Sequence, residues 1–149
     1  MSQPLLFKQE GAVAVISVND APLNRMTLDF VNQLEEIVTR IADDRDIRAA
    51  VITAEGLDNF SVGMNLFQLF DGIKAAGGPD SFFDQRLRLI AAIENMGKPW
   101  IATLFGYCLG AGLELPLGCH FRLAAAEGVQ IGLPEMDLGT VPAWGAARA

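Results

Sequence analysis

Apolar residues alternate along the first half of the chain between short continuous runs and one stretch with helical spacing. Residues 12–18 (AVAVISV) and 49–54 (AAVITA) are rich in β-branched residues, which is typical of buried strands. Between them, Thr27 can cap a helix whose apolar positions recur every three or four residues: Leu28, Val31, Leu34, Ile37 and Ile41. A helix between two continuous apolar strands favours a right-handed crossover in a mainly parallel sheet.

The second half predicts further strand and helix units. Residues 72–79 (GIKAAGGP) are expected to be a flexible break, and Asp80 or Ser81 to begin a helix with an apolar stripe at Phe83, Leu87, Ile90 and Ile93. Residues 100–105 predict a third strand, residues 106–112 a turn, and a short helix is expected from near Ala111. We expect short strands at 121–125 and 129–132, a helical turn from Pro134, and the start of another helix within 141–149. The expected fold class is α/β, in one domain spanning residues 1–149.

Composition narrows the classes of partner. The chain has 149 residues, of which 51% are hydrophobic, and a formal net charge of -7, which opposes attraction to nucleic acid or anionic lipid. The apolar stretch at 100–126 contains Glu114, His120 and Arg122, which argue against a membrane span. Two cysteines and one histidine are too few for a disulfide framework or a zinc site. No export signal is recognisable at the N-terminus, so we expect a cytoplasmic protein with no metal and no nucleic-acid or membrane partner.

Two glycine-containing turns are the first candidates for chemistry. Residues 60–66 (FSVGMNL) and 107–114 (YCLGAGLE) each lead from a strand into a helix, where backbone N–H groups lack intrahelical partners. If the turns face each other, these donors form an oxyanion hole. The alternative is that the glycines serve backbone geometry alone. A dinucleotide site is disfavoured, because the spacing G-x-x-x-G-x-G is not G-x-G-x-x-G.

Two glutamates at expected helix starts are the second candidates. Glu114 lies among Leu113, Leu115 and Leu117, where burial would raise its pKa toward the range useful for proton transfer. Glu135 follows Pro134, and two such carboxylates near one site can hold a water molecule between a base and an acid. Each of them can instead complement a helix dipole. We expect His120 to be structural.

In these segments the sequence resembles the enoyl-CoA hydratase/isomerase (crotonase) family along essentially its whole length. The resemblance rests on residues 22–24 (PLN), 60–66, 106–115 (GYCLGAGLEL), 133–135 (LPE) and 138–142 (LGTVP), in this order. It implies a crotonase-like (ClpP/crotonase) β-β-α spiral core that binds an acyl-CoA thioester. The thioester oxygen would be held by the backbone N–H groups of Met64 and Ala111. Glutamates matching Glu114 and Glu135 would activate the water that adds to a 2-enoyl-CoA.

The resemblance also implies a coenzyme A surface, an assembly and a set of related reactions. Coenzyme A would be part of the substrate, with no separate cofactor, and the family forms trimers or dimers of trimers. Related reactions are double-bond isomerisation and acyl-CoA hydrolysis, and a third possibility is a non-catalytic CoA-binding paralogue. The coenzyme would lie along Ala21, Leu23, Val62, Asn65 and Leu66.

Several features depart from the commonest family pattern. Asn65 replaces an Asp, Ala111 a Gly and Val62 an Ala. Residues 143–146 (AWGA) replace a glycine-rich stretch, so Trp144 is expected to narrow or reshape the acyl pocket. Family members are longer, and we expect the C-terminal helical part to be missing here, which would leave apolar surface uncovered.

Overall fold

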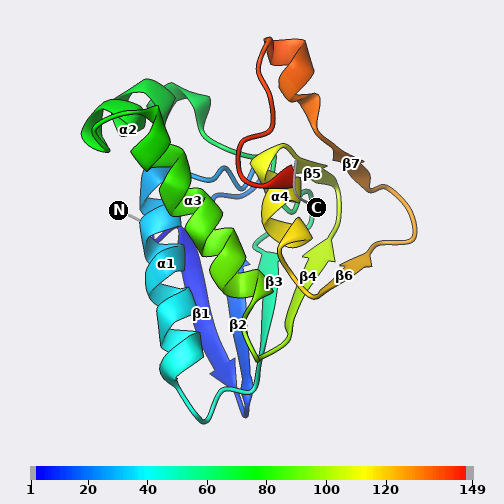
Figure 1. Cartoon of the computed structure of the whole chain (residues 1–149). Coiled ribbons are helices and arrows are strands. Elements are labelled where there is room, and N and C mark those ends of the chain that lie inside the picture. Colours follow the sequence, from blue (N-terminus) through cyan, green and yellow to red (C-terminus); the bar gives the residue numbers. More distant parts are fainter. Residues whose placement is uncertain (1–2, 147–149) are drawn as a thin grey trace.

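A computed structural model describes residues 3–146 and shows a five-stranded sheet with helices packed on one face (Figure 1). The strand order is β1-β2-β3-β4-β6. β1 pairs with β2 in antiparallel fashion, and the other neighbours are parallel. The strands are β1 (Leu5–Glu10), β2 (Val13–Val18), β3 (Ala49–Ala54), β4 (Trp100–Leu104) and β6 (Phe121–Ala124).

Helices α1 (Leu28–Asp43) and α3 (Pro79–Glu94) lie side by side over this sheet (Figure 1). α1 begins where the Thr27 side chain accepts a hydrogen bond from Phe30 N, which satisfies one of the free N–H groups of the first turn. Its buried face meets the inward side chains of β2 and β3, including Ile16 and Ile52. Among residues 3–146, none of the helices combines the length and apolar character needed to cross a bilayer.

A smaller parallel pair, β5 (Tyr107–Leu109) and β7 (Gln130–Gly132), stands beside the main sheet and carries the short helices of the site. α4 (Ala111–Leu117) follows β5 directly, and the 3-10 helix η2 (Pro134–Leu138) follows β7. The 3-10 helix η1 (Leu66–Gln68) and α2 (Leu69–Ala75) connect β3 to α3. Parallel pairing of β5 with β7 therefore places the beginnings of α4 and η2 at the same end of this pair.

The predicted strands, the first helix and the short helix from Ala111 are confirmed, and so is the α/β class. The flexible break predicted for residues 72–79 is wrong over residues 72–75, because Gly72 lies inside α2, which ends at Ala75. A β-carbon at Gly72 would come within 2.6 Å of the side chains of Leu28 and Phe82, so this glycine lets three helices approach closely. The chain turns only at Gly77 and Gly78, both with positive φ.

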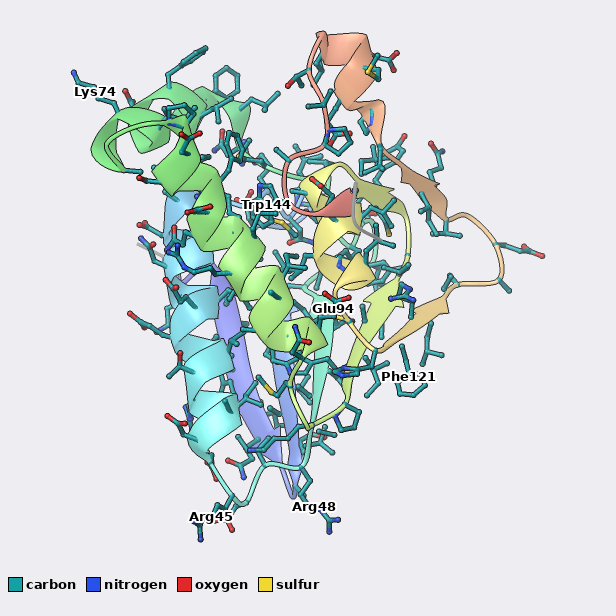
Figure 2. All side chains as sticks on the ribbon, in the orientation of Figure 1. Arg45, Arg48, Lys74, Glu94, Phe121 and Trp144 are labelled. Atoms are coloured by element: carbon teal, nitrogen blue, oxygen red, sulfur yellow. The ribbon has the colours of Figure 1, made fainter. Side chains whose placement is uncertain are left out.

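The predicted stripe of α3 is confirmed at Ile90 and Ile93 but misses the buried face in the first half of the helix. Phe83 and Leu87 are half-buried, and Phe83 lines a cavity. The fully buried side chains of α3 are Phe82, Arg86, Leu89, Ile90 and Ile93. Strands β1 and β5 were not predicted, and residues 147–149 of the expected last helix lie outside the described residues. Figure 2 shows Trp144 in the interior between α3 and α4, while Arg45 and Arg48 point outward.

Candidate active site

The two glycine-containing turns lie directly against each other. Ser61 N donates to Tyr107 O at 3.0 Å, and Leu109 N donates to Ser61 O at 3.0 Å. Gly63 allows an even closer approach, because a β-carbon there would lie 2.7 Å from Leu109 O and 3.4 Å from Ala111 N. Its φ of +97° is also a conformation that favours glycine. The two turns therefore form one joined structure.

Each turn leaves one backbone N–H free at the junction. Met26 pairs with both neighbours of Met64: Met26 N donates to Gly63 O and Asn65 N donates to Met26 O, each at 2.9 Å. Ala111 is the first residue of α4, where an amide has no intrahelical acceptor. Within residues 3–146, neither the Met64 nor the Ala111 amide donates to another residue. Ala111 has no positive φ, so its β-carbon causes no backbone strain.

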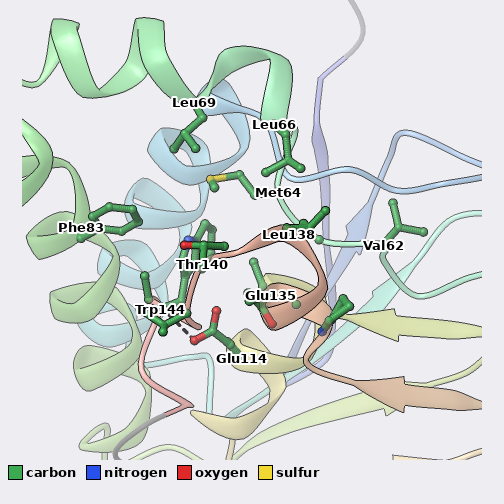
Figure 3. Close-up of a pocket in the computed structure, with 16 residues that line it drawn as sticks. Val62, Met64, Leu66, Leu69, Phe83, Glu114, Glu135, Leu138, Thr140 and Trp144 are labelled. Atoms are coloured by element: carbon green, nitrogen blue, oxygen red, sulfur yellow. Dashed lines mark hydrogen bonds between the residues drawn. The ribbon is translucent and has the colours of Figure 1, made fainter.

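A cavity of about 130 Å³ opens at this junction (Figure 3). Gly63, Met64, Gly110 and Ala111 contribute its polar backbone wall, and the carboxylates of both candidate acids reach it. The rest of the wall is largely apolar: Val62, Leu66, Leu69, Phe83, Pro134, Leu138, Val141, Ala143 and Trp144. A small apolar cavity with a few converging polar groups is the usual form of a small-molecule site.

Glu114 is held in this cavity by two backbone amides from the end of the described chain. Its side chain is buried, and Oε1 accepts hydrogen bonds from Trp144 N at 2.8 Å and Ala146 N at 3.1 Å. Burial raises the pKa of Glu114 above its ordinary value. The amides of Ala146 and Trp144 oppose this shift, and the nearby charge of Glu135 adds to it. The carboxyl is therefore fixed in position and suited to hold a proton.

Glu135 enters the cavity from the first turn of η2. Gly110 N donates to Gly132 O at 3.0 Å, which anchors the segment before η2 to the second turn. Gly110 leaves room for the carboxylate, because a β-carbon there would lie 2.7 Å from Glu135 Oε1. Glu135 Oε2 is buried, and no hydrogen-bond partner for it occurs in the described part of the chain. A buried acceptor without a partner is costly, so this oxygen is suited to a group that enters the cavity.

The predicted coenzyme-binding residues fall into two groups. Val62 and Leu66 line the cavity. Leu23 and Ala21 are exposed on the preceding loop, which is joined to the site where Val62 N donates to Leu23 O at 3.0 Å. Asn65 Oδ1 accepts from Phe67 N at 3.2 Å and caps η1. Val62 and Leu66 thus line the cavity that Glu114 and Glu135 enter. The lining does not include Ala21, Leu23 or Asn65.

Sequence reasoning missed the groups that hold Glu114. The donors on Trp144 and Ala146 are backbone amides, which every residue except proline has, so no residue type marks them. Trp144 lines the cavity. This position is the one it needs if it is to narrow or reshape the acyl pocket. His120 has a structural role, since its Nδ1 accepts a hydrogen bond from Trp100 N at 3.1 Å at the start of β4.

Comparison with known proteins identifies the family to which this chain belongs. The family model described as enoyl-CoA hydratase/isomerase matches residues 13–149. A probable enoyl-CoA hydratase of Bacillus subtilis is 33% identical over 130 residues, which are 87% of this chain and 49% of the relative. A fatty acid oxidation complex subunit alpha of Shewanella oneidensis is 31% identical over 147 residues, 96% of this chain and 21% of that protein. The chain belongs to the enoyl-CoA hydratase/isomerase family.

Solved structures lead to the same family. The structure of DspI from Pseudomonas aeruginosa is similar with a TM-score of 0.88 and 30% identity, over 99% of this chain and 59% of that one. An enoyl-CoA hydratase structure from Geobacillus kaustophilus is similar with a TM-score of 0.90 and 26% identity, over 99% of this chain and 55% of that one. The expected crotonase-like fold is therefore confirmed. The chain spans about half the length of the Bacillus subtilis relative.

Proposed function

We propose that this chain carries the reaction centre of an enoyl-CoA hydratase, which adds water to the double bond of a 2-enoyl-CoA. The observation that supports this most strongly is that the Glu114 and Glu135 carboxylates line the same small cavity as the Met64 and Ala111 amides. Coenzyme A enters as part of the substrate, along Ala21, Leu23, Val62, Asn65 and Leu66, and no further cofactor takes part.

The reaction follows from the positions of these groups. The thioester oxygen accepts hydrogen bonds from Met64 N and Ala111 N, which stabilise the negative charge that develops there. One carboxylate removes a proton from water as the water oxygen bonds to Cβ, and the other acid gives a proton to Cα. A free backbone donor of this kind lowers the barrier by about 3 to 4 kcal/mol.

Conservative replacement of either acid tests this assignment. With crotonyl-CoA as substrate, we expect Glu114→Gln and Glu135→Gln each to lower kcat about 10²- to 10⁴-fold, because an amide cannot exchange the proton. Glu127→Gln is the control, since Glu127 is exposed and outside the cavity. Unchanged rates in both cavity variants would show that these acids do not perform the chemistry.

Two alternatives use the same cavity. An isomerase moves the double bond, and a hydrolase cleaves the thioester. Retention of two carboxylates favours hydration, which needs a water molecule held between an acid and a base. Products distinguish the three, because hydration places solvent oxygen on the acyl chain, isomerisation incorporates none, and hydrolysis releases free CoA. A non-catalytic module would bind a CoA thioester in calorimetry without any of these products.

We further propose that the protein acts in the cytoplasm as a homo-oligomer, a trimer or a dimer of trimers. Large apolar side chains on β6 and η2 are exposed, including Phe121, Leu123 and Met136. Such a surface is typical of one that another part of an assembly covers. Sedimentation velocity measures the assembly, and a monomer at micromolar concentration would contradict it.

A further inference from the structure

Arg86 is a buried cation with no acidic partner. It lies on α3 with 2% of its surface exposed, and its only hydrogen bond within residues 3–146 runs from Nη1 to Phe82 O, at 2.6 Å. Its Nε has no acceptor in that range, and no Asp or Glu there comes within ion-pair distance. Burying a charge without a partner of opposite charge is strongly unfavourable. An apolar side chain would fit the core at less cost.

The guanidinium lies within cation–π distance of two aromatic rings. Its central carbon lies 3.3 Å from the centroid of the Phe82 ring and 5.5 Å from that of Trp144. Burial lowers the pKa of Arg86 to about 10, so the group stays charged at neutral pH. A cation over an aromatic face is attracted more strongly when both are removed from water. Arg86 therefore fixes the position of Trp144 from the α3 side.

The backbone of Trp144 contacts the candidate acid Glu114. Its backbone N–H donates to Glu114 Oε1 at 2.8 Å, and the Ala146 amide two residues later donates to the same oxygen. In Figure 3, Trp144 lies between Phe83 of α3 and Glu114 of α4. A continuous set of contacts thus leads from the buried cation to the carboxylate.

We propose that Arg86 is a positioning residue, which acts through Trp144 to hold the amides of residues 144 and 146 on the Glu114 carboxylate. The effect of Arg86 on the position of these amides can be measured without enzymatic activity. Its importance for catalysis rests on the proposed function. This role explains why a charged side chain is buried here: segment 144–146 has to keep its two amide donors directed at one oxygen of Glu114. No substrate contact by Arg86 is involved.

A direct effect of the charge is the main alternative explanation. Within residues 3–146, the charged groups around Glu114 are Glu135 from η2 and, beyond the Trp144 ring, Arg86 from α3, and α4 itself carries no other charge. Arg86→Met removes both the charge and the planar group. Arg86→Lys keeps a charge but loses the flat surface that stacks on the ring, so it separates positioning from simple attraction.

The test is a carbon-13 NMR titration of the Glu114 carboxyl in the whole chain. We expect Arg86→Met and Arg86→Lys both to raise its titration midpoint by about one pH unit, because a weakened charge-assisted hydrogen bond favours the neutral acid. Arg88→Met, on the exposed face of the same helix near Asp84, is the control and is expected to leave the midpoint unchanged. A wild-type midpoint in Arg86→Lys would overturn the positioning role and leave only direct attraction.

A second variant and a stability measurement guard against misfolding. Trp144→Leu keeps the backbone donors but removes the aromatic ring, and we expect it to raise the Glu114 midpoint as Arg86→Met does. Urea unfolding is expected to show that Arg86→Met is no less stable than the original chain, because it removes an unpaired buried charge. If neither variant moves the midpoint, the inference is wrong. If the chain fails to hydrate crotonyl-CoA while both variants move the midpoint, only the proposed reaction is wrong.

Discussion

At the scale of single residues, the central feature is a carboxyl group whose environment opposes its charge. Glu114 has 2% of its surface exposed, and burial is the largest influence on its pKa, which is raised although the Trp144 and Ala146 amides act to lower it. The neighbouring charge of Glu135 acts in the same direction as burial. A buried acid whose pKa is raised, beside a second carboxylate, suits a reaction in which a proton is given and taken within one cavity.

This environment predicts a pH-dependent effect on stability. The folded state binds the Glu114 proton more tightly than the unfolded chain does, so stability is lost as pH rises from the ordinary value of 4.5 through the raised pKa. Glu114→Gln keeps an oxygen that accepts from Trp144 N but does not titrate. We expect it to be at least as stable as the original chain at pH 7, with the difference vanishing near pH 4. Urea unfolding at both pH values measures this, and a variant markedly less stable at pH 7 would contradict it.

The sequence predicted much of this residue-level chemistry, because its evidence is local. Glu114 is flanked by leucines at a helix start, so its burial and raised pKa follow from its neighbours. The Arg86 contacts were not predictable in the same way. A cation on an apolar helical face is recognisable only if the buried face is predicted correctly, and in the first half of α3 the prediction placed Phe83 and Leu87 on that face in place of Phe82 and Arg86.

At the scale of elements, the site depends on how closely two turns approach. Gly63 and Gly110 both have positive φ, and each faces an atom that a β-carbon would displace: Leu109 O for Gly63 and Glu135 Oε1 for Gly110. The motif spacing indicated two glycine-containing turns before short helices. Their contact was not derivable from spacing, since it depends on the Ser61 and Cys108 bridge between segments about fifty residues apart.

Gly63→Ala tests this close approach, with Gly77→Ala as the matched control. Both glycines have positive φ, +97° and +82°, but a β-carbon at Gly77 would meet nothing within 4 Å. We expect Gly77→Ala to cost about 1 kcal/mol of strain and Gly63→Ala about 1 to 3 kcal/mol more, because it also pushes the turns apart. Denaturant unfolding gives both values. Equal losses would show that the turns tolerate separation.

The wrong prediction for residues 72–79 also belongs to this scale. Glycine and proline signals indicated a break, but Gly72 is needed inside α2 because Leu28 and Phe82 occupy the space beside it. Composition marks where a chain can bend, and packing between distant helices decides whether it does. The strands, in contrast, were predictable because their apolar runs are short, continuous and buried.

At the scale of the whole molecule, the main sheet and α1 support a site built almost entirely outside the sheet. β2, β3 and β4 form the parallel centre, and the cavity lies where η1, α3, α4 and η2 meet beyond it. The α/β class and the family were accessible from the sequence through ordered motifs. The assembly of the cavity was not, because it joins segments from residue 62 to residue 144.

The most direct test of the account is the carbonyl stretch of a bound thioester, measured by isotope-edited infrared spectroscopy with butanoyl-CoA, a saturated analogue that cannot be hydrated. The account predicts that the carbonyl frequency falls on binding, because the Met64 and Ala111 amides both donate to that oxygen. A bound thioester with the same carbonyl frequency as the free molecule in water would contradict the account.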